Sequence, residues 1–352
     1  MLELLTKQLK AGQPLSAGQV TAAVRALTEA SLPAGAKAEF LEALAEKGET
    51  IEEIAAFANE LRGLSLPVPL DAETRRREIM DVVGTGGDQL HTFNISTTSG
   101  LLLAAAGVTV AKHGNRAITS QAGSADTLEA LGIPIDLAPD QAAAALRERR
   151  FAFFFAPHYH PAFKHIAPAR RLCAERGRRT IFNFLGPLLN PARPSAILVG
   201  VPRPDLCEPL ARVLQSLGVR RGMVVCGATE DGRACMDELS LLGDNTIAEF
   251  YQERALAVSK LSPAPYRAQP VALADLVGGD RAQNADTTRR ILSGQERGPK
   301  REAVLFNAGA ALFVAGQAKS IADGWELAAR IIETGQAEAK LQELSRPNPR
   351  PD

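Results

Sequence analysis

The sequence predicts an α/β protein, in which a small all-helical domain precedes a larger α/β domain with a mostly parallel central sheet. Residues 1–66 carry helical periodicity alone, whereas from about residue 78 short apolar runs alternate with amphipathic segments. The length of 352 residues suits two domains. These observations place one domain at 1–70 and the other at 75–345.

The first segment shows several helix boundaries. Leu2, Leu5 and Leu9 fall on one helical face. The stretches SAGQ (16–19) and TIEE (50–53) fit the capping box, in which a hydroxyl residue is followed three positions later by Gln or Glu. Glycines where helices would stop and two prolines in a linker complete the pattern: Gly12, Gly48 and LSLPVPLD (64–71).

The second segment alternates strands and helices. Five apolar runs are predicted to be strands: 79–83, 107–111, 151–156, 195–201 and 221–227. Helices are predicted at 97–106, 124–132, 139–149, 205–217, 286–294 and 319–334. The run AVLFNAGAALFVAG (303–316) is a buried helix or a strand–helix unit, and residues 346–352 are expected to be a disordered tail.

Composition excludes several classes of function. Lys+Arg and Asp+Glu each number 40, so no global positive field attracts nucleic acid or an anionic membrane. The start lacks the pattern of a signal peptide, and no apolar run reaches the roughly 18 residues of a membrane helix. The four cysteines show no zinc-binding spacing and suit a reducing compartment, so a cytoplasmic location is expected.

A glycine-rich stretch, DVVGTGGDQLHTFNISTT (81–98), follows the first predicted strand. Glycines after a strand allow backbone N–H groups to converge on an anion, for which a phosphate is the usual ligand. An ordinary tight turn is the competing interpretation of a single glycine cluster. A second loop, AKHGNRAITSQAGSADTLEALG (111–132), collects basic, amide and hydroxyl donors of the kind that bind a polyanion and its sugar.

Taken in order, these motifs resemble those of anthranilate phosphoribosyltransferase. The resemblance covers roughly residues 75–245 and is carried by GTGGD, NIST, KHGNR…S…GSADTLEALG, HPAFKHIAPAR, TIFNFLGPLLNPA and MDELS. The pyrimidine nucleoside phosphorylases belong to the same fold group, but KHGNR and FNFLGPLLNP are similar to the anthranilate enzyme. The resemblance implies transfer of phosphoribose from 5-phosphoribosyl 1-diphosphate (PRPP) to the amino group of anthranilate, with release of diphosphate, in tryptophan biosynthesis.

Two alternatives remain open at this point. A transferase of the same kind could use PRPP with a related aromatic amine. A non-enzymatic relative could bind nucleic acid, although its loops would be expected to lose these residues and its surface to gain basic charge.

The resemblance also implies the site residues, and no covalent protein nucleophile is expected. The PRPP site is assigned to Gly84, Thr85, Gly86, Gly87, Asp88, Thr92, Asn94, Ile95, Ser96, Thr97, Lys112, Ser120 and Ser124. The anthranilate site is assigned to Gly84, His113, Asn115, His160, Arg170 and Pro187. Ser96, Asp237 and Glu238 are expected to hold Mg²⁺, a cation that prefers oxygen ligands.

Each assignment has a plainer interpretation. The pair Asp237–Glu238 could be a surface feature, Arg170 a helix-surface arginine and His160 a packed histidine. Two departures from the family also bear on the pocket: the longer connection LCAERGRR (172–179), and the segment 225–236, where VCG replaces the usual Val-His.

The sequence also predicts how the domains are arranged. Residues 163–193 are expected to return to the helical domain, because PAFKHIAPARRLCAERG has helical periodicity and lies between predicted strands, and the substrate cleft is expected between the two domains. The resemblance implies a homodimer through the helical domain as well.

Overall fold

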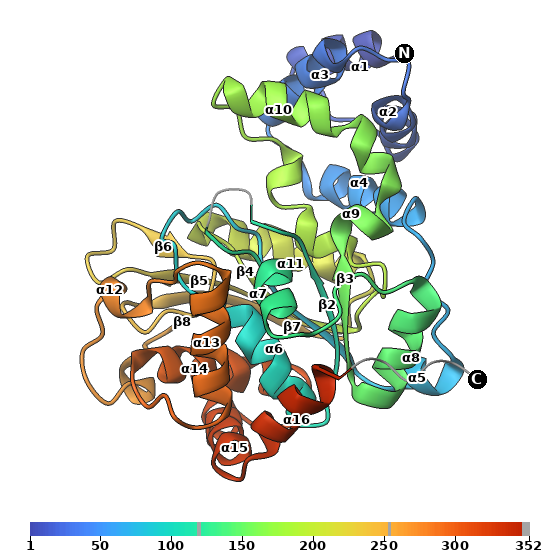
Figure 1. Cartoon of the computed structure of the whole chain (residues 1–352). Helices are drawn as coiled ribbons and strands as arrows, with labels where there is room; N and C mark the ends of the chain where they lie inside the picture. The colour runs from blue at the N-terminus through green and yellow to red at the C-terminus, as the bar shows by residue number, and fades with distance from the viewer. Residues whose placement is uncertain (118–120, 253–254, 347–352) are drawn as a thin grey trace.

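The computed structural model describes residues 1–117, 121–252 and 255–346 and shows a helical lobe above an α/β lobe (Figure 1). The helical lobe begins with α1 (Leu2–Lys10), α2 (Ala17–Thr28), α3 (Ala34–Lys47) and α4 (Ile51–Gly63). Both predicted capping boxes are formed, one by Ser16 with Gln19 and the other by Thr50 with Glu53. The expected Ser120 contact and most of the expected tail, residues 347–352, lie outside the described residues.

A later segment packs against these helices (Figure 1). It consists of α9 (Ala156–Tyr159), η1 (Pro161–His165), α10 (Ala167–Glu175), η2 (Ile181–Asn183) and η3 (Gly186–Leu189). Helix α10 lies along α3, where the buried Cys173 thiol contacts the carbonyl of Ala38. The ammonium of Lys37 donates 2.9 Å to the carbonyl of His165. The two segments share one apolar core, which continues onto α11 and one face of the sheet.

The α/β lobe is built on one eight-stranded mixed sheet in the order β3-β2-β1-β4-β5-β7-β8, with β6 paired to β5. The five predicted strands form its parallel part: β1 (Ile79–Gly84), β2 (Thr109–Gly114), β3 (Phe151–Phe155), β4 (Ala196–Gly200) and β5 (Arg221–Ala228). Three antiparallel strands were not among the predicted ones: β6 (Cys235–Met236), β7 (Asn245–Tyr251) and β8 (Ala257–Leu261). Strand β8 is an exposed edge strand, so it carries no apolar run.

Helices cover both faces of the sheet, and the apolar residues of the parallel strands alternate between its two faces. One face has a single core, whereas on the other face β2 and β3 pack against a cluster that includes α8, and β4 and β5 pack against the core shared with α11. One face is covered by α6 (Ile95–Ala105), α13 (Arg281–Leu292), α14 (Pro299–Val314), α15 (Ile321–Glu333) and α16 (Gln336–Leu344), with α7 (Ser124–Ala130) beside them. On the other face lies α11 (Cys207–Ser216), which also contacts α4. Helix α8 (Pro139–Arg149) covers β2 and β3. The remaining helices are short: α5 (Ala72–Arg76), α12 (Leu273–Leu276), η4 (Pro204–Leu206) and η5 (Ala264–Tyr266). The run 303–316 therefore lies in a buried helix and its end, not in a strand–helix unit.

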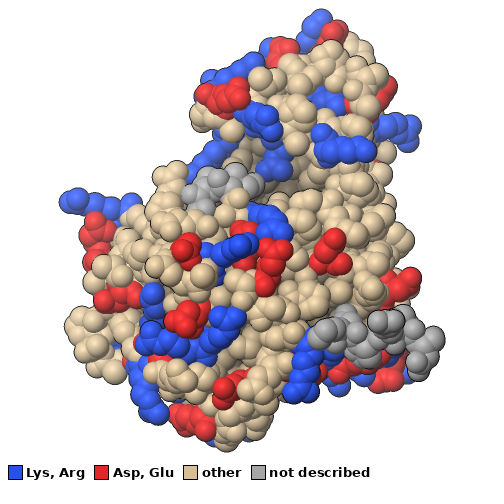
Figure 2. Space-filling view, in the orientation of Figure 1, with Lys and Arg blue, Asp and Glu red and all other residues tan. Residues whose placement is uncertain are grey.

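The carboxyl ends of the parallel strands lie at the edge of the sheet nearest the helical lobe, since α9 follows β3 there (Figure 1). In the space-filling view the surface is hollowed between the two lobes, with Lys and Arg side chains along the hollow (Figure 2). Ligands of open α/β sheets bind at this edge. No helix in the described part of the chain is long and apolar enough to cross a bilayer.

Candidate functional site

The glycine-rich turn directly follows β1 and contacts the segment after β6 that contains Asp237. Gly86 and Gly87 have φ angles of 75° and 86°, which glycine adopts without strain. A Cβ on Gly84 would lie 2.1 Å from Oδ2 of Asp237, so only glycine permits this approach. The N–H of Gly86 donates 2.6 Å to the same oxygen. The predicted phosphate loop and the predicted metal ligands are therefore adjacent.

Asp237 and Glu238 are half-buried and lie close to the carboxyl group of Asp88. Oε1 of Glu238 accepts 3.2 Å from the N–H of Ser96, in the first turn of α6. Burial removes water from both carboxyl groups and raises the pKa of each. Repulsion from Asp88 raises the pKa of Asp237 further, and repulsion from Asp237 raises that of Glu238 further. Concentrated negative charge of this kind suits a cation.

The fit of a divalent ion follows from the donors present. Oδ2 of Asp88 is buried without a hydrogen-bond partner in the described structure. Across residues 1–117, 121–252 and 255–346, no three His, Cys, Asp or Glu side chains are placed to hold one ion by themselves. Mg²⁺ is commonly held by one or two carboxylates, with water and substrate phosphates as its other ligands. Asp237 and Glu238 fit that pattern better than they fit a closed protein cage.

Lys112 lies beneath these groups at the end of β2 and is fully buried. Its ammonium donates 2.6 Å to the carbonyl of Val82 and 3.4 Å to Oγ of Ser96. Burial lowers its pKa, while the neighbouring carboxylates of Asp81 and Glu238 oppose that shift. The positive charge of Lys112 thus sits below the loop, close to the acidic pair.

The NIST motif opens α6, as its position after the loop suggests. Asn94 is the residue before the helix, and its Oδ1 accepts from Thr127 at 2.6 Å and from Asn284 at 3.0 Å. These bonds tie the helix start to α7 and α13. Of the other assigned residues, Ile95 and Thr97 are buried in the first turn.

Two further loop residues are held by backbone contacts. Thr85 Oγ1 donates 3.3 Å to the carbonyl of Gly86, and Thr92 forms an antiparallel bridge with Val277. Thr92 is therefore joined to the chain after α12.

The second loop leaves β2 and returns at α7. Asn115 is exposed, and its carbonyl accepts 3.2 Å from Oγ of Ser124, the first residue of α7. Arg116 is paired with Asp126 at 2.9 Å and also with Glu129, so its charge is compensated within the loop.

Two buried histidines join the sheet to the returning segment. Nδ1 of His113 lies 3.2 Å from the carbonyl of Gly186, and the Nε2 atoms of His113 and His160 are 3.3 Å apart. Burial lowers the pKa of His113 to about 3 and that of His160 to about 4. Both rings are therefore neutral near pH 7. Pro187, also assigned to the acceptor site, is buried beside Gly186 in η3.

Arg170 lies on α10, with its guanidinium carbon 5.2 Å from the centre of the Phe182 ring. Burial lowers its pKa. No carboxylate in the described part of the chain forms an ion pair with it, whereas Arg176, further along, pairs with Glu42. A cation in this state is suited to receive an anionic group from outside the chain.

Sequence reasoning missed a set of buried polar residues that support the site. Asp81 is fully buried within β1, where burial raises its pKa to about 6. Asn190 donates 2.8 Å to Asp81 and 2.7 Å to the carbonyl of Ala111. An aspartate inside the apolar run IMDVV was a signal that could have identified the first of these. Asn307, on α14, is another, and it likewise stands inside an apolar run, AVLFNAGAALFVAG.

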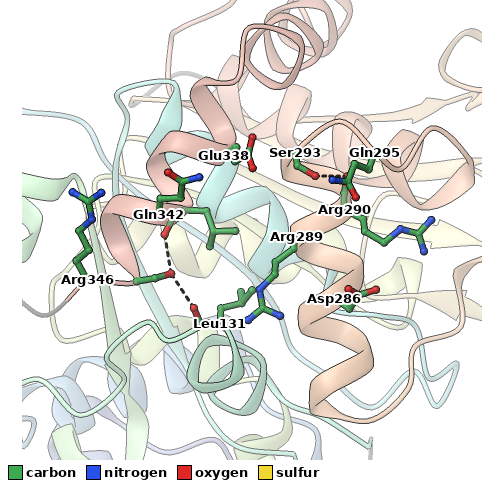
Figure 3. A pocket seen from close by; sticks show the side chains of 11 residues that line it. Leu131, Asp286, Arg289, Arg290, Ser293, Gln295, Glu338, Gln342 and Arg346 are labelled. Carbon is green, nitrogen blue, oxygen red and sulfur yellow. Dashed lines mark hydrogen bonds between the residues drawn. The ribbon is translucent and has the colours of Figure 1, made fainter.

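Another pocket lies away from these residues, between the end of α7, α13 and α16 (Figure 3). Arg289 donates 2.7 Å to the carbonyl of Ala130, and Arg290 pairs with Glu296 at 3.0 Å. Both cations already have partners within the chain, and the pocket contains none of the residues assigned to substrate.

Comparisons with known proteins agree with the division into a helical domain and an α/β domain. Residues 76–338 match the α/β domain of a glycosyl transferase family, and residues 4–65 match the helical bundle domain of the same type. The chain is 40% identical over 335 residues to the anthranilate phosphoribosyltransferase of Shewanella sp. (strain ANA-3), covering 95% of this chain and 94% of that protein. It is 46% identical over 307 residues to that of Lacticaseibacillus paracasei, covering 87% and 86%.

Solved structures give the same result. The crystal structure of the anthranilate phosphoribosyltransferase from Thermus thermophilus has a TM-score of 0.87 at 39% identity and covers 97% of this chain and 98% of its own. The enzyme from Saccharomyces cerevisiae in complex with PRPP and Mg shares the fold, with a TM-score of 0.85 at 24% identity over 97% and 96% of the two chains.

Proposed function

The chain belongs to the anthranilate phosphoribosyltransferase family, and we propose that it transfers phosphoribose from PRPP to the amino group of anthranilate, releasing diphosphate. The product is N-(5-phosphoribosyl)anthranilate, an intermediate of tryptophan biosynthesis. The observation that carries this proposal is the meeting of the glycine loop with the acidic pair, where Gly86 binds Asp237.

PRPP is proposed to lie over the carboxyl ends of β1 and β2. Gly84, Gly86 and Gly87 keep the loop free of side chains, so its backbone can approach the diphosphate. The N-terminus of α6 points its first N–H groups to the same place, although that of Ser96 is taken by Glu238. The remaining polar groups assigned to PRPP are proposed to bind its phosphates and ribose hydroxyls, with donors to the phosphate oxygens and the Asp88 carboxylate as an acceptor: Thr85, Asp88, Thr92, Asn94, the backbone of Ile95, Thr97, Lys112 and Ser124. Ser120, assigned by the resemblance, lies outside the described residues.

Ser96, Asp237 and Glu238 would hold Mg²⁺ between themselves and the diphosphate. When bound, the ion neutralises negative charge that grows on the leaving diphosphate. Lys112 supplies a fixed positive charge close by, which compensates Glu238. The residues of this chain therefore act on the leaving group by charge and position.

No protein nucleophile is needed for this chemistry. Departure of diphosphate leaves positive character at the ribosyl carbon, which the amino group of the acceptor then attacks. Catalysis of such a transfer depends on positioning and on stabilising the leaving charge. The polar groups of this site, held by backbone contacts, provide both.

The acceptor is proposed to bind between the second loop and the returning segment. Arg170 would bind the carboxylate of anthranilate, since a guanidinium offers two parallel donors. The neutral rings of His113 and His160 would line the pocket without adding a competing charge. Gly84, Asn115 and Pro187 complete the proposed acceptor site.

The contacts of the two departures from the family are made with other parts of the chain. In the longer connection, Arg176 pairs with Glu42 at 2.9 Å and Arg178 with Glu46 at 3.3 Å, so this segment faces α3. Cys226 packs into the core shared with α11, on a face of the sheet. Anthranilate is favoured over a related aromatic amine by Arg170, which forms no ion pair in the described part of the chain, and by the similarity to the anthranilate enzymes.

The proposal is tested by diphosphate release from PRPP and Mg²⁺ with a panel of aromatic amines. Turnover is expected to be fast with anthranilate and poor with aniline, which lacks the carboxylate. Release with none of the amines would contradict the assigned activity, whereas preference for a different amine would contradict only the acceptor.

A homodimer through the helical lobe is also proposed. Leu4 is 69% exposed on α1, although Leu2 and Leu5 on either side are buried. A large apolar side chain in that position is suited to a protein contact.

A further inference from the structure

The acidic pair belongs to a short segment, residues 237–240, that follows β6 and pairs with no strand of the described structure. This segment crosses the ends of β1, β4 and β5, where glycines make room for it. A Cβ on Gly200 would lie 1.5 Å from the carbonyl oxygen of Asp237, and one on Gly227 would lie 2.4 Å from Cβ of Ser240. On the side of the sheet, the segment therefore packs directly against the backbone of β4 and β5.

On its other side, the segment is held by Asn307, one of the buried polar residues that the sequence analysis missed. The side chain of Asn307 is fully buried on α14. Its Oδ1 accepts 2.9 Å from the N–H of Leu239, and its Nδ2 donates 3.0 Å to the carbonyl of the same residue. The second proton of Nδ2 goes to the carbonyl of Ala303 at 3.0 Å. One amide therefore satisfies both backbone groups of the residue that follows Glu238.

The next residue is held in the same way by a different asparagine. The N–H of Ser240 donates 2.7 Å to Oδ1 of Asn245, and Nδ2 of Asn245 donates 3.0 Å to the carbonyl of Ser240. Backbone that would pair with a neighbouring strand is paired instead with two side chains. Because these bonds are buried, breaking one leaves a polar group without a partner.

We infer that Asn307 is a positioning residue for the divalent cation, acting by fixing the backbone of Leu239 so that Asp237 and Glu238 face the diphosphate. The inference rests on the proposed function, in which these carboxylates hold Mg²⁺. Asn307 touches neither substrate nor ion, and its effect passes through two bonded backbone groups. Groups that orient metal ligands commonly change metal affinity or activity ten- to a hundredfold when removed.

The direct test is Asn307→Leu, which keeps the approximate volume and removes both hydrogen bonds to Leu239. Gly200→Ala disturbs the same segment from the side of the sheet without touching α14, so it serves if the first variant fails to fold. Leu312→Ala is the matched control, because it creates a cavity in the same helix and leaves Asn307 in place.

Two quantities should be measured in each protein. One is the Mg²⁺ concentration that gives half-maximal turnover. The other is binding of Mn²⁺ to the protein with PRPP and without acceptor, followed by the EPR signal of free Mn²⁺ and corrected for a blank of PRPP alone. Asn307→Leu and Gly200→Ala are expected to raise the half-maximal Mg²⁺ concentration and the Kd for Mn²⁺ about ten- to a hundredfold each. The KM for anthranilate is expected to change little. Leu312→Ala is expected to lower the melting temperature and leave both metal values unchanged.

Two different failures can be told apart. If native protein turns over PRPP and binds Mn²⁺, but Asn307→Leu changes only the melting temperature, as Leu312→Ala does, Asn307 is merely structural and the inference is wrong. If native protein neither turns over PRPP nor binds Mn²⁺ with it, the proposed function itself is wrong.

Discussion

The backbone N–H of Gly86 donates a 2.6 Å hydrogen bond to Oδ2 of Asp237, joining two segments 151 residues apart. The bond orients one carboxylate oxygen toward the glycine loop. It also couples the loop proposed to hold diphosphate to the residues proposed to hold the cation. Changes on either side should therefore appear in the response to both ligands.

Replacing either member of the acidic pair should impair metal-dependent turnover far more than folding. Asp237→Ala or Glu238→Ala removes a ligand beside the leaving diphosphate, and loss of such charge stabilisation costs roughly 3–4 kcal/mol in the transition state. Turnover measured against Mg²⁺ concentration tests this. Asp244→Asn, an exposed acidic residue nearby, is the control and should behave as native protein. Near-normal activity of either alanine variant at limiting Mg²⁺ would show that the pair is a surface feature.

Arg170→Ala should raise the KM for anthranilate and leave that for PRPP almost unchanged. Loss of a charge-assisted hydrogen bond costs about 1.5–3 kcal/mol, equivalent to roughly 10- to 150-fold in kcat/KM. The neighbouring Arg171→Ala is the matched control, because Arg171 is exposed on the same helix. Aniline should be a poor substrate for the native protein and little worse for the variant. Equal rates with aniline and anthranilate would mean that no carboxylate is recognised.

The buried histidine pair should make the protein sensitive to acid. The pKa values of His113 and His160 in the folded state, about 3 and about 4, lie below the value near 6.5 of the unfolded chain. The unfolded state therefore binds more protons below pH 6.5, and stability falls as pH decreases from about 6.5 to 4. Each histidine can contribute up to about 1.4 kcal/mol per pH unit.

Urea unfolding at several pH values measures this dependence. His160→Gln should be less stable than the native protein at pH 7 but should lose less stability between pH 6.5 and 4. His91→Asn, at an exposed position, should keep the native slope. An unchanged slope in His160→Gln would show that the ring is not held neutral.

The proposed dimer should depend on the helical lobe. Leu4→Glu places a charge where an apolar contact is expected, so the variant should sediment as a monomer or dissociate at a higher protein concentration. Val258→Glu is the control, because Val258 is 51% exposed on the edge strand β8 of the other lobe. Sedimentation of native protein as a monomer at all concentrations would contradict the dimer, and equal effects of both variants would place the contact elsewhere.

Features set by short-range chemistry could be predicted from the sequence. The caps at Ser16 and Thr50 need only residues three positions apart, and the five parallel strands are rich in apolar residues because both of their faces are buried. The predicted fold class, a small helical domain with a larger α/β domain, is confirmed because it depends on these local patterns.

Long-range contacts could not be predicted in this way. The bonds between Asn307 and Leu239 join residues 68 positions apart, and an asparagine within a helical run carries no mark of its distant partner. Strand β8 has no apolar pattern because it lies at the sheet edge. The motifs gave the candidate site residues through resemblance, but their support by Asp81, Asn190 and Asn307 required the structure.

The bond from Asn307 to Leu239 bears on how the protein is made. During synthesis the glycine loop and the acidic pair emerge well before α14, since domains form from the N-terminal side as the ribosome proceeds. Until Pro299–Val314 has left the exit tunnel, the backbone of Leu239 has no partner from that helix. A nascent chain would therefore carry every proposed ligand before their arrangement is fixed, and full affinity for Mg²⁺ is expected only after α14 has emerged.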